Sequence, residues 1–257
     1  MRQLDLNADV GEGLPDVDRV LMPLISSANI ACGLHAGDPD TMRATVALAS
    51  QHGVAVGAHP GYRDAEGFGR RPVKLTHSQV VDLLLYQLGA LSAIAEAEGA
   101  PLDHVKPHGA LYNQAEVDDE LAAAIVDGIR IFDPRLRLVG RAGSAMQRVA
   151  DSMGQAFTSE AFADRRYLPD GRLKSRSEAG AVLTDPEQLT EQVRLLVTHG
   201  EVLADDGSRL SVAFESLCLH SDTPGSVALA ARVRQELDRL GVSVSAPHLL
   251  GVDTLPP

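Results

Sequence analysis

Ionisable side chains follow several of the short apolar runs in this sequence. The run SANIAC leads to His35, and the run VAVGA leads directly to His59. A later run ends at Lys106, with His108 two residues further on. Imidazole and ammonium groups transfer protons or stabilise developing charge in enzymes. Because these groups recur at the same point of successive runs, they predict one shared reactive site.

Acidic and amide side chains occupy the same kind of position. Asn7 and Asp9 are two residues apart near the end of the first apolar run, so a strand would present both on one face. A carboxylate in such a site can act as a general base. Four further candidates follow apolar runs in the same way: Glu12, Glu160, His220 and Asp222.

Two glycine- and arginine-rich stretches, 60–74 and 160–176, lack helical periodicity and are long for loops of a compact domain. Loops of this length are usually functional or mobile. Arg70, Arg71 and Arg165 in these stretches are candidates for binding carboxylate or phosphate oxygens, with exposed surface arginines as the alternative. A candidate substrate contact outside them is Tyr112, for which loop packing is the alternative.

The elements that would position these residues alternate along the chain. Short β-prone runs are separated by segments of helical periodicity, which is typical of a mostly parallel sheet covered by helices. In a parallel barrel the carboxyl ends of the strands face one cavity, where active sites lie. The expected strands are 3–7, 29–32, 54–58, 103–106, 136–139, 155–158, 217–220 and 242–244.

The expected helices carry clear boundary signals. Asp38, Asp185 and Thr223 each precede a proline, a combination typical of a helix start. Thr76 and Gln79 match a capping box. Glycines that predict helix ends occur at positions 53, 99 and 200. Histidines outside the strand ends are interpreted as solvated or capping residues: His52, His77, His104, His199 and His248.

Composition narrows the class of protein. The chain has 257 residues and a formal net charge of −12, which argues against nucleic acid or an anionic membrane as a partner. No Pro/Ser-rich linker or repeat interrupts it, so residues 1–257 are expected to form one domain. The two cysteines predict no disulfide framework and suit a reducing, cytoplasmic location. Neither a signal peptide nor an apolar run of spanning length is expected.

Several familiar sequence motifs are missing. The chain contains neither a phosphate-binding loop of the G-x-x-x-x-G-K-[ST] type nor a G-x-G-x-x-G fingerprint after a strand. It also lacks the G-x-S-x-G elbow of α/β-hydrolases. The sequence therefore predicts no recognisable nucleotide cradle of its own.

Six segments in register resemble the LamB/YcsF family, the A subunits of bacterial 5-oxoprolinases. They are DLNADVGE, SANIACGLHAGD, GAHPGYRDAEGFGRR, VKPHGALYN, FADRRYLPDGRL and CLHSDTPG, and they extend over nearly the whole chain. One departure is Ser221, where the family pattern usually has glycine between the residues that match His220 and Asp222.

The resemblance implies both a fold and an activity. The fold would be a distorted seven-stranded (β/α) barrel of the α/β class, related to glycoside hydrolase and polysaccharide deacetylase barrels. The activity would be the ATP-dependent hydrolysis of the 5-oxo-L-proline lactam to L-glutamate, carried out with partner subunits B and C. ATP would be a co-substrate, with Mg²⁺ held through those partners.

The chemistry of this reaction suggests roles for the candidates. Asp9, Glu12 or His59 could act as the base that activates water. Lys106 and His108 could stabilise developing negative charge. Binding of the substrate is assigned to a larger set: Asn7, His35, Arg70, Arg71, Tyr112, Glu160, Arg165, His220 and Asp222.

Two other functions are compatible with the sequence. The chain could be a metal-dependent deacetylase or amidohydrolase that acts alone, with a divalent ion held by Asp9, His35 and His59. It could also be a non-catalytic scaffold that binds substrate for its partners, although the candidate bases argue against this. The resemblance favours the ATP-dependent lactam hydrolase.

Overall fold

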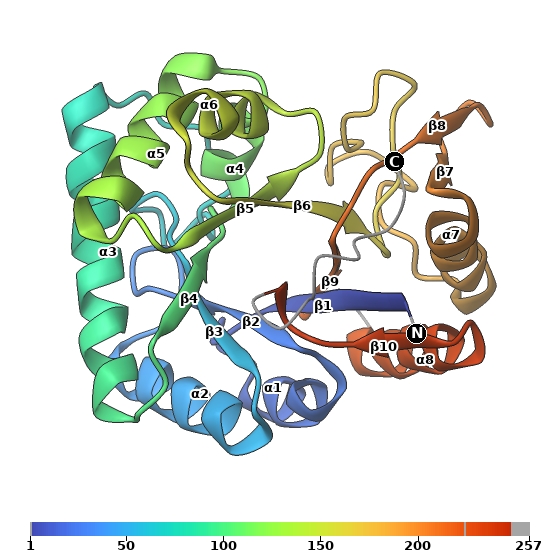
Figure 1. The fold of residues 1–257 in the computed structure, drawn as a ribbon, viewed down its shortest axis with the longest axis horizontal. Helices are drawn as coiled ribbons and strands as arrows, with labels where there is room; N and C mark the ends of the chain where they lie inside the picture. The colour runs from blue at the N-terminus through green and yellow to red at the C-terminus, as the bar shows by residue number, and fades with distance from the viewer. Residues whose placement is uncertain (1, 224, 248–257) are drawn as a thin grey trace.

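Parallel strands close into a barrel in the computed structural model, which describes residues 2–223 and 225–247 (Figure 1). Within these residues, seven strands form the barrel in chain order, and the last of them pairs with the first. They are β1 (Arg2–Val10), β2 (Ser27–Ala31), β3 (Ala55–His59), β4 (Leu102–Val105), β5 (Arg137–Arg141), β6 (Phe157–Phe162) and β9 (Ser216–His220). The expected seven-stranded (β/α) barrel is confirmed.

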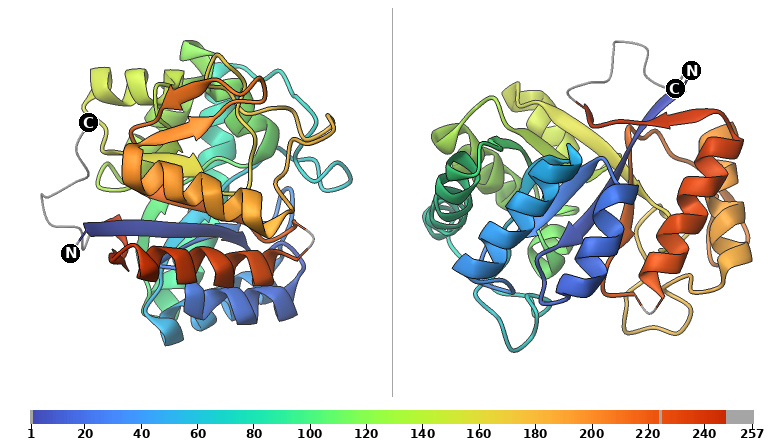
Figure 2. Two further views of the ribbon diagram at one scale, coloured as in Figure 1. Left: turned by 90° about the vertical axis from the view of Figure 1, so that its right-hand side faces the viewer. Right: turned by 90° about the horizontal axis from the view of Figure 1, so that it is seen from below.

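Helices surround the barrel, and α7 and α8 lie side by side on one flank (Figure 2). The described helices are α1 (Pro15–Leu21), the 3-10 turn η1 (Met22–Leu24), α2 (Pro39–His52), α3 (His77–Ala97), α4 (Gly109–Ala115), α5 (Asp119–Phe132), α6 (Ala145–Met153), α7 (Pro186–His199) and α8 (Ser226–Arg239).

Local signals explain where most helices begin and end. The Asp38 carboxylate accepts a hydrogen bond from the backbone N–H of Thr41 at 2.7 Å and caps α2. Thr76 and Gln79 form both bonds of a capping box at the start of α3. Gly53 and Gly200 adopt left-handed conformations after α2 and α7.

The start of α8 differs from the expectation. Thr223 does not cap it; the helix begins at Ser226 after Gly225. The Thr223 hydroxyl donates instead to Asp164 at 3.2 Å, because it faces the barrel end rather than the helix. Pro224 and His248 lie outside the described residues.

Other elements lie outside the barrel. β10 (Val242–Val244) pairs in parallel with the first residues of β1, and β9 pairs with the residues of β1 that follow. β7 (Glu201–Leu203) and β8 (Arg209–Ser211) form an antiparallel hairpin that the sequence reasoning missed. Both strands are only three residues long, so their periodicity is too short to detect.

Helix α3 is long and apolar enough to span a membrane by length and composition, contrary to the sequence expectation. It packs as a core helix instead. Val80, Leu84, Leu88 and Leu91 on one face are buried in the hydrophobic cluster that joins the helices to the barrel. Its opposite face carries exposed residues such as Tyr86. A single helix of this kind is weak evidence for a membrane.

Alternate residues of a barrel strand face opposite sides of the wall, and the two sides differ in polarity. Along β1, Leu4, Leu6 and Ala8 are buried in the hydrophobic cluster with the helices. The alternating residues Asp5, Asn7 and Asp9 face the barrel interior, where they bond to side chains of other strands. The barrel interior is therefore polar, and its carboxyl end carries the candidate residues.

Candidate active site

The Lys106 ammonium lies at the centre of the candidate site, just after β4. Its Nζ atom is 2.9 Å from Glu160 Oε2, 3.3 Å from Asp9 Oδ1 and 3.1 Å from Asn7 Oδ1. It also contacts Cys218 Sγ at 3.0 Å. Burial alone would lower the pKa of Lys106, but the neighbouring carboxylates raise it well above its usual value. Lys106 is therefore a permanent buried cation.

Asp9 presents one carboxylate oxygen to the interior and the other to the site. Its Oδ1 atom accepts hydrogen bonds from Asn29 Nδ2 at 2.9 Å and from Lys106. Its Oδ2 atom is 3.5 Å from His59 Nε2. Burial would raise the pKa of Asp9, but the charges of His59 and Lys106 hold it well below its usual value. Asp9 is thus ionised.

Three histidines and Glu12 form the wall beside Asp9. His59 and His108 approach each other with 3.1 Å between Nε2 and Nδ1. The rings of His35 and His108 are stacked, with centroids 3.7 Å apart. Glu12 Oε1 lies 3.2 Å from His35 Nε2 and 3.3 Å from His108 Nδ1. These residues come from the ends of β1, β2, β3 and β4.

The environment of this wall shifts several pKa values in opposite directions. Burial lowers the pKa of His35 to about 4, so it is neutral at pH 7. Burial opposes ionisation of Glu12, but its polar contacts with His108 and His35 lower its pKa to about 2. Burial also disfavours a charged His59, yet the negative charges of Asp9 and Glu12 raise its pKa overall. Such shifts are typical of functional sites.

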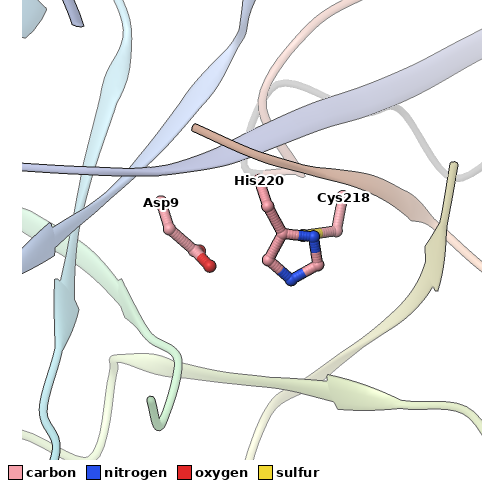
Figure 3. Close-up of side chains that lie close together, drawn as sticks. All are labelled: Asp9, Cys218 and His220. Carbon is pink, nitrogen blue, oxygen red and sulfur yellow. The ribbon is translucent and has the colours of Figure 1, made fainter. Parts of the chain in front are cut away.

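A second group approaches Asp9 from β9. Asp9, Cys218 and His220 offer ligand-type atoms within 4.8 Å of one another, and Figure 3 shows the Asp9 carboxylate facing the His220 ring. His220 Nδ1 lies 2.9 Å from Asp164 Oδ1, which orients the ring. Burial and the nearby carboxylates raise the pKa of Cys218 well above its usual value, although Lys106 opposes this shift. Cys218 is therefore a neutral thiol.

A cavity of about 730 Å³ opens above these groups. One side is formed by Asp9, Glu12, His59, Lys106 and His108. The other side belongs largely to the loop between β6 and α7, which is rich in cations. The basic residues that line the cavity outside its floor are Arg70, Arg165, Arg172, Lys174 and Arg176.

The basic side chains that line the upper part of the cavity, called its rim, differ in the partners that they already have. Arg165 is buried and donates to the backbone carbonyl of Lys174 at 2.6 Å, so it holds the loop in place. Arg70 forms an ion pair with Asp222, and Arg176 contacts the same carboxylate at 3.3 Å. The Nη2 atom of Arg176 is buried and has no partner among the described residues. It remains available to an anionic ligand.

The structure brings together most of the residues proposed from the sequence. The cavity is lined by Asp9, Glu12, His59, Arg70, Lys106, His108, Tyr112, Arg165, His220 and Asp222. Asn7 and Glu160 lie beneath it as partners of Lys106. His35 lies behind Glu12 and His108.

Arg71 is not placed to bind a ligand in this cavity. Its guanidinium turns back to the Asp64 carboxylate of the same loop, and the side chain is 61% exposed. Ser221, in contrast, causes no strain: among the described non-glycine residues only Phe68 has a positive φ.

Sequence reasoning misjudged His104. It is buried inside the barrel, and its Nε2 atom is 2.8 Å from Asn29 Oδ1. The spacing His104, Lys106, His108 contained the signal, since alternate residues of a strand share a face. Asp164, Arg172, Lys174 and Arg176 were also missed, because loop residues carry no periodic signal.

The expected metal trio does not form as a unit. Among the described residues, Asp9, His35 and His59 are not a group with ligand atoms close together. His35 Nε2 bonds to Glu12, which removes that atom from the cavity. The structure instead groups Glu12, His59 and His108.

Comparison with known proteins identifies the family of this barrel. The model of the LamB/YcsF family matches residues 4–250. The chain belongs to the LamB/YcsF family. It is 46% identical over 246 residues to the A subunit of 5-oxoprolinase from Haemophilus influenzae strain PittEE, covering 96% of this chain and all of that protein. It is 49% identical over 251 residues to the A subunit of 5-oxoprolinase from Symbiobacterium thermophilum, covering 96% of both chains.

A solved crystal structure supports the same architecture. The crystal structure of the lactam utilization protein from Thermus thermophilus superposes with a TM-score of 0.89 at 46% identity. The superposition covers 95% of this chain and 99% of that one. The family resemblance found in the sequence is therefore confirmed over almost the full length.

Proposed function

We propose that this chain is the A subunit of an ATP-dependent 5-oxoprolinase. It would open the lactam ring of 5-oxo-L-proline to L-glutamate in the cytoplasm, coupled to ATP hydrolysis and together with subunits B and C. The relatives at 46–49% identity are named as A subunits of 5-oxoprolinase. A continuous hydrophobic cluster from Leu4 to Val242 supports the view that the chain works as one domain.

The observation that carries the proposal is the charge distribution of the cavity. Ionised Asp9 and the Lys106 ammonium lie side by side on its floor, in a setting where both charges are fixed by burial and neighbours. Lactam hydrolysis needs a carboxylate near the attacking water and a positive charge near the carbonyl oxygen. Asp9 and Lys106, whose Oδ1 and Nζ atoms lie 3.3 Å apart, could supply these two groups.

The Asp9 Oδ2 atom, which lies 3.5 Å from His59 Nε2, is the proposed base. Its Oδ1 atom is already held by Asn29 and Lys106, so the carboxylate is fixed in orientation. Water held by Oδ2 would lose a proton as its oxygen bonds to the lactam carbonyl carbon. The carbon–nitrogen bond then breaks, and the ring nitrogen takes up a proton to leave as the amine of glutamate. Lys106 would stabilise negative charge on the carbonyl oxygen or on the phosphoryl group that it carries, whereas His108, whose Nε2 donates to the Phe68 carbonyl, is not proposed for this role.

The cationic rim supports the coupling to ATP. An amide is poorly electrophilic, and transfer of the γ-phosphoryl group of ATP to its oxygen would activate the carbon and release ADP. Addition of water and cleavage of the carbon–nitrogen bond would then leave an acyl phosphate, which a second water would hydrolyse to the carboxylate and inorganic phosphate. A 5-oxoproline molecule has nine non-hydrogen atoms, so it leaves much of the 730 Å³ unfilled. Arg70, Arg172, Lys174 and Arg176 line the remaining space, where they could bind carboxylate and phosphate oxygens. Tyr112 also lines the cavity.

ATP activation is assigned to the partner subunits. The chain has no phosphate-binding loop or dinucleotide fingerprint, so Mg²⁺ and ATP are proposed to bind there. Purified alone, the chain should release no phosphate in response to 5-oxo-L-proline. Added to subunits B and C, it should restore formation of both glutamate and phosphate.

The alternative is a metal-dependent deacetylase or amidohydrolase that needs no partner. The group Glu12, His59 and His108 favours this alternative. It predicts ATP-independent cleavage of an amide or ester by the lone chain, abolished by a chelator and restored by a divalent ion. Robust activity of that kind would replace the ATP-dependent proposal.

A further inference from the structure

The protonation of the histidines beside Asp9 follows from their partners. His59 Nδ1 lies 2.7 Å from the carbonyl oxygen of Lys106, and a carbonyl can only accept, so Nδ1 carries the proton. By the same argument His108 Nε2, 2.8 Å from the carbonyl oxygen of Phe68, carries its proton there. In the neutral rings, His59 Nε2 and His108 Nδ1 therefore both hold lone pairs.

These two lone pairs face each other. The nitrogens are 3.1 Å apart, and Glu12 Oε1 lies 3.3 Å from one and 3.9 Å from the other. With both rings neutral, all three atoms are acceptors, and all three side chains are buried. Acceptors packed together away from water repel one another unless a cation lies among them.

The local charge balance indicates the same need. Three buried carboxylates, Asp9, Glu12 and Glu160, surround the floor of the cavity, and Lys106 is the buried ammonium beside them. With neutral histidines these four groups sum to a charge of −2, from three negative charges and one positive charge. Two buried negative charges without counter-charges are unstable, so a divalent cation or two protons must balance them.

The spacing suits a metal ion. Ligand atoms about 2.0–2.1 Å from a zinc-like ion lie about 2.8–3.4 Å from one another in octahedral or tetrahedral geometry. Two of the separations, 3.1 and 3.3 Å, fall in this range, and the third, between Glu12 Oε1 and His59 Nε2, is 3.9 Å. Two imidazole nitrogens and one carboxylate oxygen suit a first-row transition metal better than magnesium or calcium.

We propose that Glu12 Oε1, His59 Nε2 and His108 Nδ1 bind a divalent transition-metal ion such as zinc at the wall of the cavity. Asp9 Oδ2, 3.5 Å from His59 Nε2, is placed to contact the same ion. The backbone carbonyls of Lys106 and Phe68 fix the tautomers of the two histidines, and His35 holds Glu12 from behind. Such supporting contacts are usual for histidine and carboxylate ligands.

The neighbouring group of Asp9, Cys218 and His220 is not the proposed site, although its atoms are equally close. The Lys106 ammonium lies 3.0 Å from Cys218 Sγ and 3.3 Å from Asp9 Oδ1, so a cation already occupies that position. A metal ion there would be repelled by Lys106, and the neutral thiol is a poor ligand. Of the two groups, only that of Glu12 lacks such an ammonium contact among the described residues.

The metal site is independent of the ATP-dependent proposal and is tested by binding alone. The full chain is treated with a chelator, dialysed and titrated with Zn²⁺ by calorimetry and with Co²⁺ by visible absorption. One ion per chain should bind, with a dissociation constant of micromolar or below. The Co²⁺ spectrum should show the d–d bands of a site with nitrogen and oxygen ligands and no thiolate charge-transfer band.

Matched variants locate the ion. Glu12→Gln keeps the shape of the side chain and an acceptor for His35, and it should weaken binding at least about tenfold. His108→Gln should do the same. Cys218→Ser, which alters only the second group, and His77→Gln, a histidine exposed on α3, should leave the affinity unchanged.

Two results would overturn the metal site. One is the absence of stoichiometric Zn²⁺ or Co²⁺ binding in a folded chain, with imidazole ¹⁵N shifts showing protons on His59 Nε2 or His108 Nδ1. The other is binding that Cys218→Ser abolishes and Glu12→Gln leaves intact. Partner- and ATP-dependent turnover is measured separately, so either result leaves the proposed function standing.

Discussion

Asp9 is held in one orientation by Asn29 and Lys106, and its second oxygen faces the cavity. The change Asp9→Asn is nearly isosteric, so packing should survive while the proposed base is lost. Turnover of the complex with subunits B and C should fall about 10²–10⁴-fold. Circular dichroism should show an intact fold.

Asp16→Asn is the matched control for this change. Asp16 lies on α1 with a side chain 93% exposed, and its ion-pair partner is Arg19 on the same helix. Its turnover should equal that of the wild type. Near-normal turnover of Asp9→Asn in the same assay would exclude Asp9 as the base.

Lys106 is expected to contribute both to the stability of the fold and to the proposed catalysis. Lys106→Met leaves the buried carboxylates of Asp9 and Glu160 without their shared cation. Breaking such a pair from one side costs about 3–5 kcal/mol, so the free energy of unfolding should fall by that order in denaturant titrations.

Adding Glu160→Gln to Lys106→Met should recover part of this loss, because one of the two unpaired charges is removed. Activity should not return, since the cation is still missing. A double variant as unstable as Lys106→Met alone would mean that packing, and not charge, sets the cost.

At the scale of the elements, β3 and β4 are in close contact at Gly57, where a side chain would not fit. A Cβ atom on Gly57 would lie 2.0 Å from His104 Nε2, so Gly57→Ala must displace a ring that is bonded to Asn29. Overpacking of a core costs about 1–3 kcal/mol, and thermal unfolding should show a corresponding decrease in stability.

Gly89→Ala is the matched comparison. Gly89 lies inside α3, and an added Cβ would meet no atom within 4 Å. The same substitution should therefore stabilise the protein by about 0.5–1 kcal/mol, since alanine is the better helix former. Equal effects at both positions would contradict the close contact between β3 and β4.

Helix α1 contains a carboxyl group with a raised pKa. Asp18 is buried and accepts a hydrogen bond from the Gly11 backbone N–H at 2.9 Å. Burial, assisted by the charge of Glu12 and opposed by this bond, raises the pKa of Asp18 to about 6 from an ordinary value of 3.8.

For the whole molecule this shift predicts a pH dependence of stability. Below about pH 4 both states bind the proton, and the contribution of Asp18 is complete. Between about pH 4 and 6 only the folded state keeps the proton, so stability decreases as the pH rises through about 6. Asp18→Asn should remove this decrease, gaining about 2–3 kcal/mol relative to the wild type between pH 4 and 7.

Urea titrations of both proteins across this pH range measure the difference. Asp16→Asn again serves as the control, since its side chain is 93% exposed on the same helix. A difference between Asp18→Asn and the wild type that does not change with pH would show that Asp18 titrates normally in the folded state.

The order of the elements followed from the sequence alone. Strand runs, capping residues such as Asp38 and the glycine after α2 depend on neighbours in the chain, so local patterns were sufficient to predict them. The family resemblance predicted the closed barrel, and the position of His59 and Lys106 after their strands predicted a common end. Short elements such as the β7–β8 hairpin lacked enough residues for a period to appear.

Tertiary structure decided which atoms meet. His104 and His52 look alike in the sequence, yet barrel closure buries one and leaves the other exposed. Arg70 lines the cavity while its neighbour Arg71 bonds to Asp64. The grouping of Glu12 with His59 and His108, in place of the expected trio, arises because strands far apart in the chain are brought into register by the sheet. Contacts of this kind depend on long-range pairing, and residue spacing along one strand does not determine them.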